Sequence, residues 1–248
     1  MPETDAIFRE VHQVNQAADA SDNMLRISLD AKATLKIGEY SRGGSNRVEV
    51  AAADHDFRPD ATVTPFGFLL PRYGDLFLYF GTSKVTSDFI VDTIEQWWCE
   101  NKPRFPKIDT LVLLQDNGPE NNGRRTQFLH RMVEFVEQHQ INVRLAYYPP
   151  YHSKYNPVER CWGVLENHWN GSLLDSAEAV TGFAQSMTWK QKHPLVRLAT
   201  QAYESGVRIS KTAMKAVNEN SHGFHISPPG SSTSIPTKPL NNLFPENP

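Results

Sequence analysis

The sequence has only two cysteines among its 248 residues, Cys99 and Cys161, and neither has a second cysteine nearby. A disulfide framework or a cysteine zinc site is therefore not indicated, and we expect both to act as small hydrophobic residues on helices. No apolar run approaches the ~20 residues that a membrane-spanning helix requires. The chain starts with the acidic MPETDAIFREVHQ, which lacks the basic and then apolar order of a signal peptide. We expect a soluble, intracellular protein.

Strong charge is also missing. The net charge of −3 argues against a chain that binds DNA through bulk positive charge. Its distribution is uneven, because residues 1–23 carry five acids and one Arg, whereas residues 187–248 carry seven Lys or Arg and three acids. The C-terminal part is therefore the better candidate to face phosphates. An apolar fraction of 39% with five Trp supports a real core, so most of the chain should fold.

Alternation of apolar and polar residues predicts the strands in the first half of the chain. After a helical or frayed lead-in at 1–23, the first strand begins at Met24 and ends at Asp30. A hairpin follows, with strands at 63–70 and 76–80. Further predictions are an extended piece at 31–38, a turn at 42–46, a strand at 47–51 and a polar loop at 53–59.

In the second half of the chain, the main signal is the helical spacing of apolar residues. It predicts a helix that Thr82 or Ser83 caps and that Pro103 and Pro106 end. Further predictions are buried strands at 110–116 and 142–148, a helix at 124–140, and a helix that Asn156-Pro157 opens and that runs to about Trp169. Residues 175–225 are expected to be mostly helical, and residues 226–248, with six prolines, to be disordered.

This order of elements predicts a mixed α/β sheet covered by helices. The expected organisation is a lead-in at 1–23, a catalytic core at 24–175, a helical C-terminal extension at 176–225 and a tail at 226–248.

Three acids occupy informative places: Asp30 and Asp116 at the ends of strands, and Glu159 in the first turn of a helix. Strand ends and helix starts converge on one rim of an α/β sheet. Carboxylates gathered there require cations, and hard oxygen ligands select Mg²⁺ or Mn²⁺. Two such ions ~3.5–4 Å apart can promote in-line phosphoryl transfer. By position alone, however, capping of strands and helices explains acids of this kind better.

The residues around these acids favour the metal-binding explanation over capping. LLQDNGPEN (113–121) resembles the second acid block of DDE transposases, and YYPPYHSKYNPVERCW (147–162) resembles the third acid block, which is shared with the Tc-mariner group. With ISLDAK (27–32) and the Arg-Gly-Gly turn, the chain most resembles the ISAzo-type branch of bacterial insertion-sequence transposases, the Rhodopirellula-type DDE domain. The resemblance runs from about Ile7 to about Phe224.

That resemblance implies an RNase H-like fold and a metal-binding catalytic triad of Asp30, Asp116 and Glu159 that holds two Mg²⁺ or Mn²⁺ ions. It implies hydrolytic nicking at transposon ends, followed by attack of the freed 3′-hydroxyl on target DNA, without a covalent enzyme intermediate. The expected partners are double-stranded DNA and further copies of the chain assembled on it, in the bacterial cytoplasm.

Several polar residues near the acids are candidate DNA contacts: Asn117, Arg124, Arg125, His152 and Lys154. For His152 and Lys154 a structural loop role is equally open, and Arg124-Arg125 at a helix start indicates either an anionic partner or simple solvent exposure. Four tyrosines, at 147, 148, 151 and 155, could stack on bases or pack against Pro149-Pro150.

Other acids have less support for a catalytic role. Asp54-His55-Asp56 has metal-ligand residue types, but polar loop clusters usually face water. Glu120 is better explained as a solvated loop residue or helix cap than as a fourth acid. Glu166 is the alternative to Glu159 on the same helix face, although Asn156-Pro157 favours Glu159. Trp97, Trp98 and Trp162 are predicted to be core residues.

Only 29 residues precede Asp30, so we expect a fragment or truncated form that lacks the usual N-terminal DNA-recognition module. Two alternatives stay open. One is a metal-dependent nuclease of the same fold that cuts without joining, and the other is a non-catalytic DNA-binding protein derived from a transposase.

Overall fold

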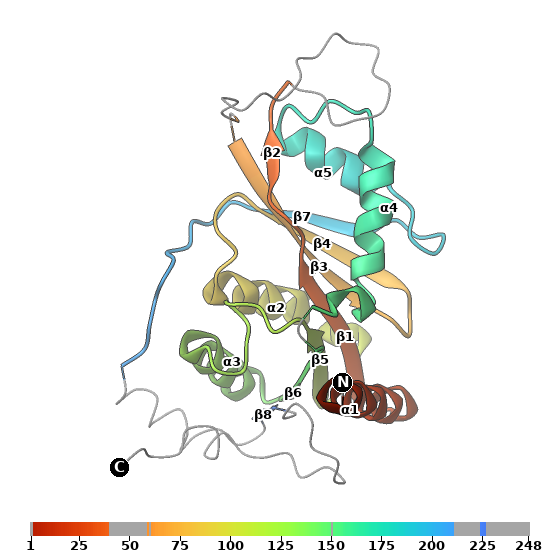
Figure 1. Ribbon diagram of the computed structural model, residues 1–248, viewed down its shortest axis with the longest axis vertical. Helices are drawn as coiled ribbons and strands as arrows, with labels where there is room; N and C mark the ends of the chain where they lie inside the picture. The colour runs from red at the N-terminus through yellow and green to blue at the C-terminus, as the bar shows by residue number, and fades with distance from the viewer. Residues whose placement is uncertain (1, 40–58, 60, 150, 211–223, 227–248) are drawn as a thin grey trace. The chain divides into compact units, whose positions relative to one another are not determined.

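The computed structural model describes residues 2–39, 59, 61–149, 151–210 and 224–226. Along the chain, a first helix is followed by a run of strands, after which helices and strands are mixed (Figure 1). The helices are α1 (Pro2–Ala20), α2 (Ser87–Asn101), η1 (Lys102–Arg104), α3 (Thr126–His139), η2 (Ser153–Tyr155), α4 (Glu159–Trp169) and α5 (Ala177–Ser186). The strands are β1 (Met24–Ala31), β2 (Leu35–Ile37), β3 (Ala61–Leu70), β4 (Asp75–Gly81), β5 (Thr110–Gln115), β6 (Asn142–Tyr147), β7 (Leu195–Ala199) and β8 (Phe224–Ile226).

The strands form a mixed sheet in the order β7-β4-β3-β1-β5-β6-β8, and β2 pairs with β3. β5 is parallel to β1 and to β6, whereas β3 and β4 form an antiparallel hairpin. The sheet contains both parallel and antiparallel pairs, and helices connect several of its strands. This confirms the predicted mixed α/β class.

The chain divides into two compact units. The first comprises residues 1–28, 86–156 and 204–248, and the second comprises residues 29–85 and 157–203. The division falls within β1, between Ser28 and Leu29.

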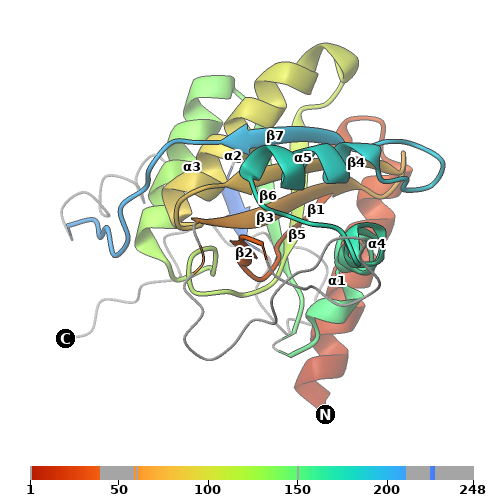
Figure 2. The ribbon, with the colours of Figure 1, turned by 90° about the horizontal axis from the view of Figure 1, so that it is seen from above.

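In the first unit, strands β5 and β6 lie between α1 and the pair α2 and α3 (Figures 1 and 2). The lead-in predicted as helical or frayed is a helix of 19 residues. Its apolar side chains Val11, Val14 and Ala18 are buried against the sheet residues Val112, Leu114, Ala146 and Tyr148. Helix α1 is therefore part of the core of this unit.

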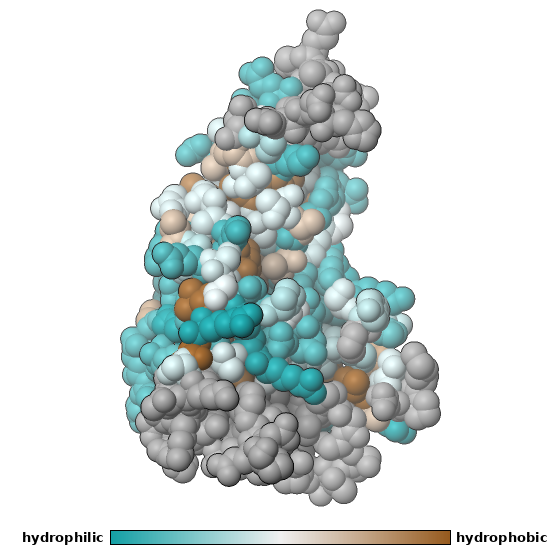
Figure 3. Space-filling model, turned by 60° about the vertical axis from the view of Figure 1, so that its left-hand side comes forward, coloured by the Kyte–Doolittle hydropathy of each residue, from teal (hydrophilic) through white to brown (hydrophobic). Residues whose placement is uncertain are grey.

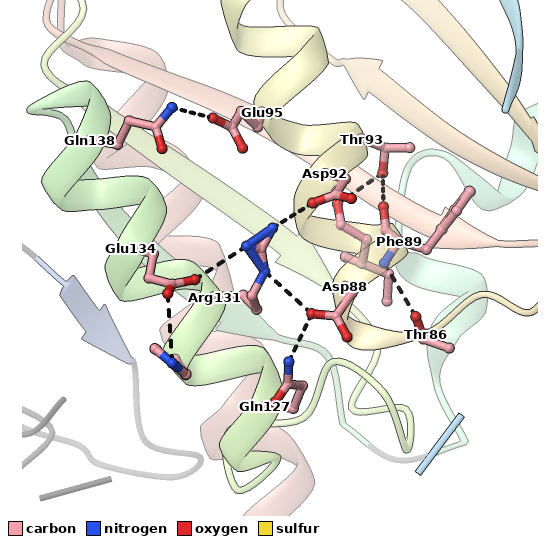
Figure 4. A network of polar contacts seen from close by, with 12 residues as sticks. Thr86, Asp88, Phe89, Asp92, Thr93, Glu95, Gln127, Arg131, Glu134 and Gln138 are labelled. Atoms are coloured by element: carbon pink, nitrogen blue, oxygen red, sulfur yellow. Dashed lines mark hydrogen bonds and ion pairs between the residues drawn. The ribbon is translucent and has the colours of Figure 1, made fainter. Parts of the chain in front are cut away.

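On the other side of these strands, α2 and α3 are joined by ion pairs centred on Arg131 (Figure 4). The guanidinium contacts Asp88, Asp92 and Glu134. Gln127 Nε2 also donates to Asp88 Oδ1 at 2.8 Å. The two helices are thus held together by polar contacts as well as by their apolar faces.

In the second unit, α4 and α5 pack with β2, β3, β4 and β7 around one apolar cluster. Leu76, Leu78 and Phe80 of β4 point into this cluster. Successive side chains in a strand point to opposite faces, and Tyr79 accordingly packs edge to face on Phe68 instead. Both faces of the hairpin are therefore buried.

The start of α2 differs from the prediction. Its N-cap is Thr86, whose side chain accepts from Phe89 N, and neither Thr82 nor Ser83 caps the helix. Thr82 N instead donates to Ala199 O, and Ser83 Oγ donates to Gln201 O. The pairing of β4 with β7 thus continues past β4 and delays the helix.

The C-terminal part also differs from the predicted helical extension. Within residues 175–210, α5 ends at Ser186, and residues 195–199 form a strand parallel to β4. Leu195-Val-Arg-Leu-Ala is too short to show a clear period, so pairing with β4 determines its structure. The elements predicted at 42–46 and 47–51 and the loop at 53–59 apart from Pro59 lie outside the described residues. The same holds for the tail predicted at 226–248, except for Ile226, which ends β8.

The cysteines are both unpaired and both on helices, but only Cys161 is buried, so the prediction for Cys99 is wrong. No helix within the described ranges is long and apolar enough to cross a membrane. On the face shown in Figure 3, the coloured residues are mostly hydrophilic and the apolar ones are scattered. Two of the exposed large hydrophobic residues are Tyr151, which precedes η2, and Tyr155, the last residue of η2.

Candidate active site

Asp30 lies near the end of β1, where the sequence predicted it. Its side chain is only 7% exposed, although an ionised carboxylate is costly to bury without partners. Trp162 of α4 provides one partner, because its indole Nε1 donates to Asp30 Oδ2 at 2.7 Å. Residue 162 is buried as predicted, but it also makes this polar contact.

Glu159 is the first residue of α4 and is half-buried. A carboxylate in the first turn of a helix is stabilised by the helix dipole. The segment before the helix is fixed by Asn156, which is fully buried and accepts a hydrogen bond from Ser28 Oγ. The Asn-Pro pair that predicted the helix start therefore also connects that segment to β1.

Trp162 can reach Asp30 because the neighbouring strand has a glycine. A Cβ placed on Gly67 of β3 would lie 2.7 Å from Trp162 Cη2 and 3.0 Å from Val158 Cγ2. Real Cβ atoms do not make such close contacts with fixed groups. Gly67 thus leaves the space that the indole occupies beside β3.

Asp116 directly follows β5, in the first unit. Asn121 Nδ2 donates to Asp116 Oδ1 at 3.0 Å. Asn121 is itself fixed, since Tyr147 Oη donates to its carbonyl oxygen at 2.8 Å. A Cβ on Gly118 would lie 3.2 Å from Asp116 Oδ1, so this turn packs closely around the carboxylate.

Glu120 stabilises the loop after Asp116. Its carboxylate accepts from Ser87 N, the first residue of α2, at 3.2 Å, and forms an ion pair with Arg125 at 3.2 Å. This agrees with the helix-cap explanation of Glu120 and also gives Arg125 a structural partner. Glu166, the alternative to Glu159, is exposed and forms an ion pair with Lys32 at 2.6 Å.

The candidate DNA contacts lie in the first unit and differ in their surroundings. Asn117, Arg124 and Lys154 are exposed. His152 is half-buried, with its ring 5.5 Å from that of Phe8. Of the four tyrosines considered for base stacking, Tyr147 and Tyr148 are buried, whereas Tyr151 and Tyr155 are exposed.

The structure brings Asp30 and the first turns of α4 together within the second unit, and places Asp116 in the first unit. Among the residues that the structure describes, no group of three or more His, Cys, Asp or Glu side chains is close enough to hold one metal ion. The meeting of all three acids therefore stays a prediction.

The donor types nevertheless suit a hard divalent cation, since all three predicted ligands are carboxylates. One observation near Asp116 supports this. Asn121 Oδ1 is buried and has no hydrogen-bond partner among the described residues, next to the carboxylate that its own Nδ2 contacts. Such an atom is costly to leave unpaired and would accept a hydrogen bond from a water on a cation held by Asp116.

The sequence analysis did not identify Asn121, Gly67 or the polar role of Trp162. The Glu-x-x-Trp spacing at 159–162 was the available signal for the last, because residues three apart in a helix share a face. The partners in β1 and β3 are distant in sequence, so no local pattern indicated them.

The mixed sheet with its flanking helices is the fold expected of an RNase H-like domain. A family model described as the Rhodopirellula transposase DDE domain matches residues 1–227, and the chain belongs to this family. The family confirms the resemblance on which the predicted triad depends. No curated protein sequence matches the chain.

Solved structures of Mos1 transposase are similar to the chain. The Mos1 transposase paired-end complex with left transposon end matches with a TM-score of 0.50 and 12% identity over 73% of this chain. The Mos1 mariner paired end complex with Mn matches with a TM-score of 0.50 and 9% identity over the same share. Likeness at this identity shows the fold, and it confirms the predicted RNase H-like class. The chain spans about half, 52%, of the length of these Mos1 chains.

Proposed function

We propose that this chain is the catalytic domain of a transposase that cleaves DNA and transfers strands with divalent metal ions, through Asp30, Asp116 and Glu159. The observation that carries the proposal is the hydrogen bond from Trp162 to Asp30. This bond connects Asp30, the first predicted acid, to the turn of α4 that begins with Glu159, the third. The chain also belongs to a family of DDE transposase domains.

The residues of the chain would act by holding these carboxylates in place. Trp162 fixes one oxygen of Asp30, and Asn121 fixes one oxygen of Asp116. Helix α4 presents Glu159 from its first turn, where the helix dipole also favours a phosphate. Fixed ligands matter because phosphoryl transfer depends mainly on positioning and on stabilisation of negative charge.

Asp30, Asp116 and Glu159 would together hold Mg²⁺ or Mn²⁺, two ions in the complete site. When bound, such ions offset the repulsion among the carboxylates and stabilise charge on the attacking and leaving oxygens of a phosphodiester. Mg²⁺ needs few protein ligands, because waters and substrate phosphates complete its shell.

Double-stranded DNA at transposon ends and in the target is the proposed substrate, and copies of the chain would assemble on it. The Mos1 neighbour is a complex with a transposon end. The exposed Asn117, Arg124 and Lys154 would contact the DNA, and His152 and Arg125 would contribute beside them. Such contacts position the backbone without reading sequence, so binding by this chain should weaken steeply with salt.

The test of the chemistry is nicking of supercoiled plasmid by the purified chain with Mg²⁺ or Mn²⁺, compared with Ca²⁺ and EDTA. Asp30→Asn, Asp116→Asn and Glu159→Gln should each reduce nicking by at least about a hundredfold, because each removes a metal ligand. The matched control is Glu166→Gln, which changes an exposed acid of the same helix and should leave nicking unchanged. Full activity in Asp116→Asn would contradict the proposal.

Strand transfer is tested separately with oligonucleotides that end in a free 3′-hydroxyl and a labelled target plasmid. A transposase domain should join the two, whereas a nuclease of the same fold should only nick. Joining that disappears together with nicking in Glu159→Gln would assign both reactions to one site. Nicking without joining would favour the nuclease alternative.

A further inference from the structure

Trp162 has a polar role that neither its burial nor the family match explains. Its indole Nε1 lies 2.7 Å from Asp30 Oδ2, and both side chains are buried, with 5% and 7% exposed. A hydrogen bond to a buried carboxylate is stronger than one between neutral groups and fixes the orientation of that carboxylate. An indole N–H can only donate, so Asp30 Oδ2 is the acceptor of this hydrogen bond.

The position of Trp162 is set from two sides. It lies three residues after Glu159, hence on the same face of α4 and one turn along. On the strand side, Gly67 leaves room for the ring, because a Cβ there would meet Trp162 Cη2 at 2.7 Å. The indole therefore has one place in which to lie, and in that place it reaches Asp30.

We propose that Trp162 is a positioning residue for the metal site, which orients Asp30 through its indole N–H, and that Gly67 is required for this contact. The inference rests on the proposed function, since it assumes that Asp30 is a metal ligand. Groups that orient metal ligands typically change metal affinity or activity ten- to a hundredfold when they are removed.

The test compares two Trp→Phe substitutions in α4. Trp162→Phe keeps an aromatic ring and removes the donor to Asp30. Trp169→Phe removes a buried indole from the same helix whose Nε1 contacts Glu166 at 3.3 Å and not Asp30. We expect the Mg²⁺ concentration for half-maximal nicking to rise about tenfold in Trp162→Phe and to stay unchanged in Trp169→Phe. Urea unfolding curves of both variants show whether the fold is retained.

A second readout does not depend on activity. The sequence has five tryptophans, so ¹H–¹⁵N spectra should contain up to five indole signals, and the one absent from Trp162→Phe belongs to residue 162. Without DNA, added Mg²⁺ should shift this signal more than that of Trp169, and Asp30→Asn should abolish the response. The backbone amide of Asp30 should titrate at higher Mg²⁺ in Trp162→Phe than in the wild type.

The outcomes separate this inference from the function itself. Equal Mg²⁺ dependence in Trp162→Phe and the wild type would overturn it, as would equal losses in both Trp→Phe variants. A wild-type chain that binds Mg²⁺ through Asp30 without nicking DNA would contradict the proposed function and still support the role of Trp162. A wild-type chain that neither binds Mg²⁺ nor nicks DNA would overturn both.

Discussion

Ser28 and Asn156 are separated by 128 positions in the sequence and share a hydrogen bond in which Ser28 Oγ donates to Asn156 Oδ1. Both side chains are completely buried. Ser28 precedes Asp30 by two residues in β1, and Asn156 precedes Glu159 by three. The contact therefore fixes, relative to each other, the two segments that lead to the first and third predicted acids.

Ser28→Ala should lower the free energy of unfolding by about 1–3 kcal/mol, because it leaves a buried polar partner with one hydrogen bond fewer. Asn156→Ala should have a similar or larger effect. Urea unfolding measures both, and the double variant tests whether they act through each other. Two effects that simply add would show that the bond between the two side chains contributes nothing to stability.

Asn121→Asp tests whether Asp116 belongs to a metal site. The substitution replaces the amide that donates to Asp116 at 3.0 Å with a second carboxylate, so the two side chains should repel each other. We expect a loss of about 1–3 kcal/mol in stability without metal, part of which Mg²⁺ restores. Thermal unfolding with and without Mg²⁺ measures this.

The control for that measurement is Asn167→Asp, which adds the same charge at an exposed position of α4. Mg²⁺ should not stabilise this variant more than the wild type. If Mg²⁺ stabilises both Asn→Asp variants equally, Asp116 is not at a metal site.

Two Gly→Ala substitutions, one beside Trp162 and one control, test the packing around this residue. Gly67→Ala should destabilise the fold and weaken nicking together, because the new Cβ would meet the indole at 2.7 Å. Gly163→Ala adds a Cβ that meets nothing within 4 Å on the exposed side of α4, and should raise stability by up to about 1 kcal/mol. Unfolding midpoints and nicking rates of both variants check this. Normal Mg²⁺ dependence in a folded Gly67→Ala protein would contradict the need for the glycine.

Elements with a clear period were predictable from the sequence. The strand at 110–115 and the helix at 126–139 have buried residues where the pattern placed them, and β3 and β4 form the hairpin predicted at 63–70 and 76–80. These elements are determined by local alternation or helical spacing. The motif around residue 159 predicted the start of α4 to within two residues, because Pro157 was expected at the first helical position and the helix begins at Glu159.

Elements that depend on distant partners were not predictable in this way. Strand β7 exists because it pairs with β4, more than a hundred residues earlier, and the same pairing moves the cap of α2 to Thr86. The catalytic role predicted for Asp30 rests on resemblance, and its contact with Trp162 depends on a gap that Gly67 leaves in a third segment. Patterns of neighbouring residues in a single sequence do not indicate such contacts.

The two cysteines should differ sharply in reactivity. Burial raises the pKa of the Cys161 thiol to about 12, whereas Cys99 is exposed. Since the thiolate is the reactive form, one thiol per folded chain should react with a maleimide or a disulfide reagent at pH 8, and Cys99→Ser should remove that reaction. Unfolding in urea should expose the second thiol. Rapid labelling of Cys161 in the folded chain would contradict its burial.

The same pKa shift predicts a pH dependence of stability. Between the ordinary thiol pKa of 9.0 and about 12, the unfolded chain loses the Cys161 proton while the folded chain keeps it. The folded state then binds more protons, so the free energy of unfolding falls as pH rises through this window. Cys161→Ala should show a shallower decline above pH 9 than the wild type in urea unfolding.

Arg131 should stabilise the pairing of α2 and α3 through charge. Burial alone would lower the pKa of its guanidinium, but the hydrogen bond and charge of Asp92, with Glu134 and Asp88, together raise it. These partners are partly exposed, so Arg131→Met should cost about 1 kcal/mol at low salt, and less at 1 M NaCl, where screening acts within about 3 Å. Arg131→Lys keeps the positive charge but loses the planar guanidinium, so its stability should lie between those of the wild type and Arg131→Met. Urea unfolding at both salt concentrations measures this, and a loss that salt does not change would assign the effect to packing of the aliphatic part of Arg131 instead.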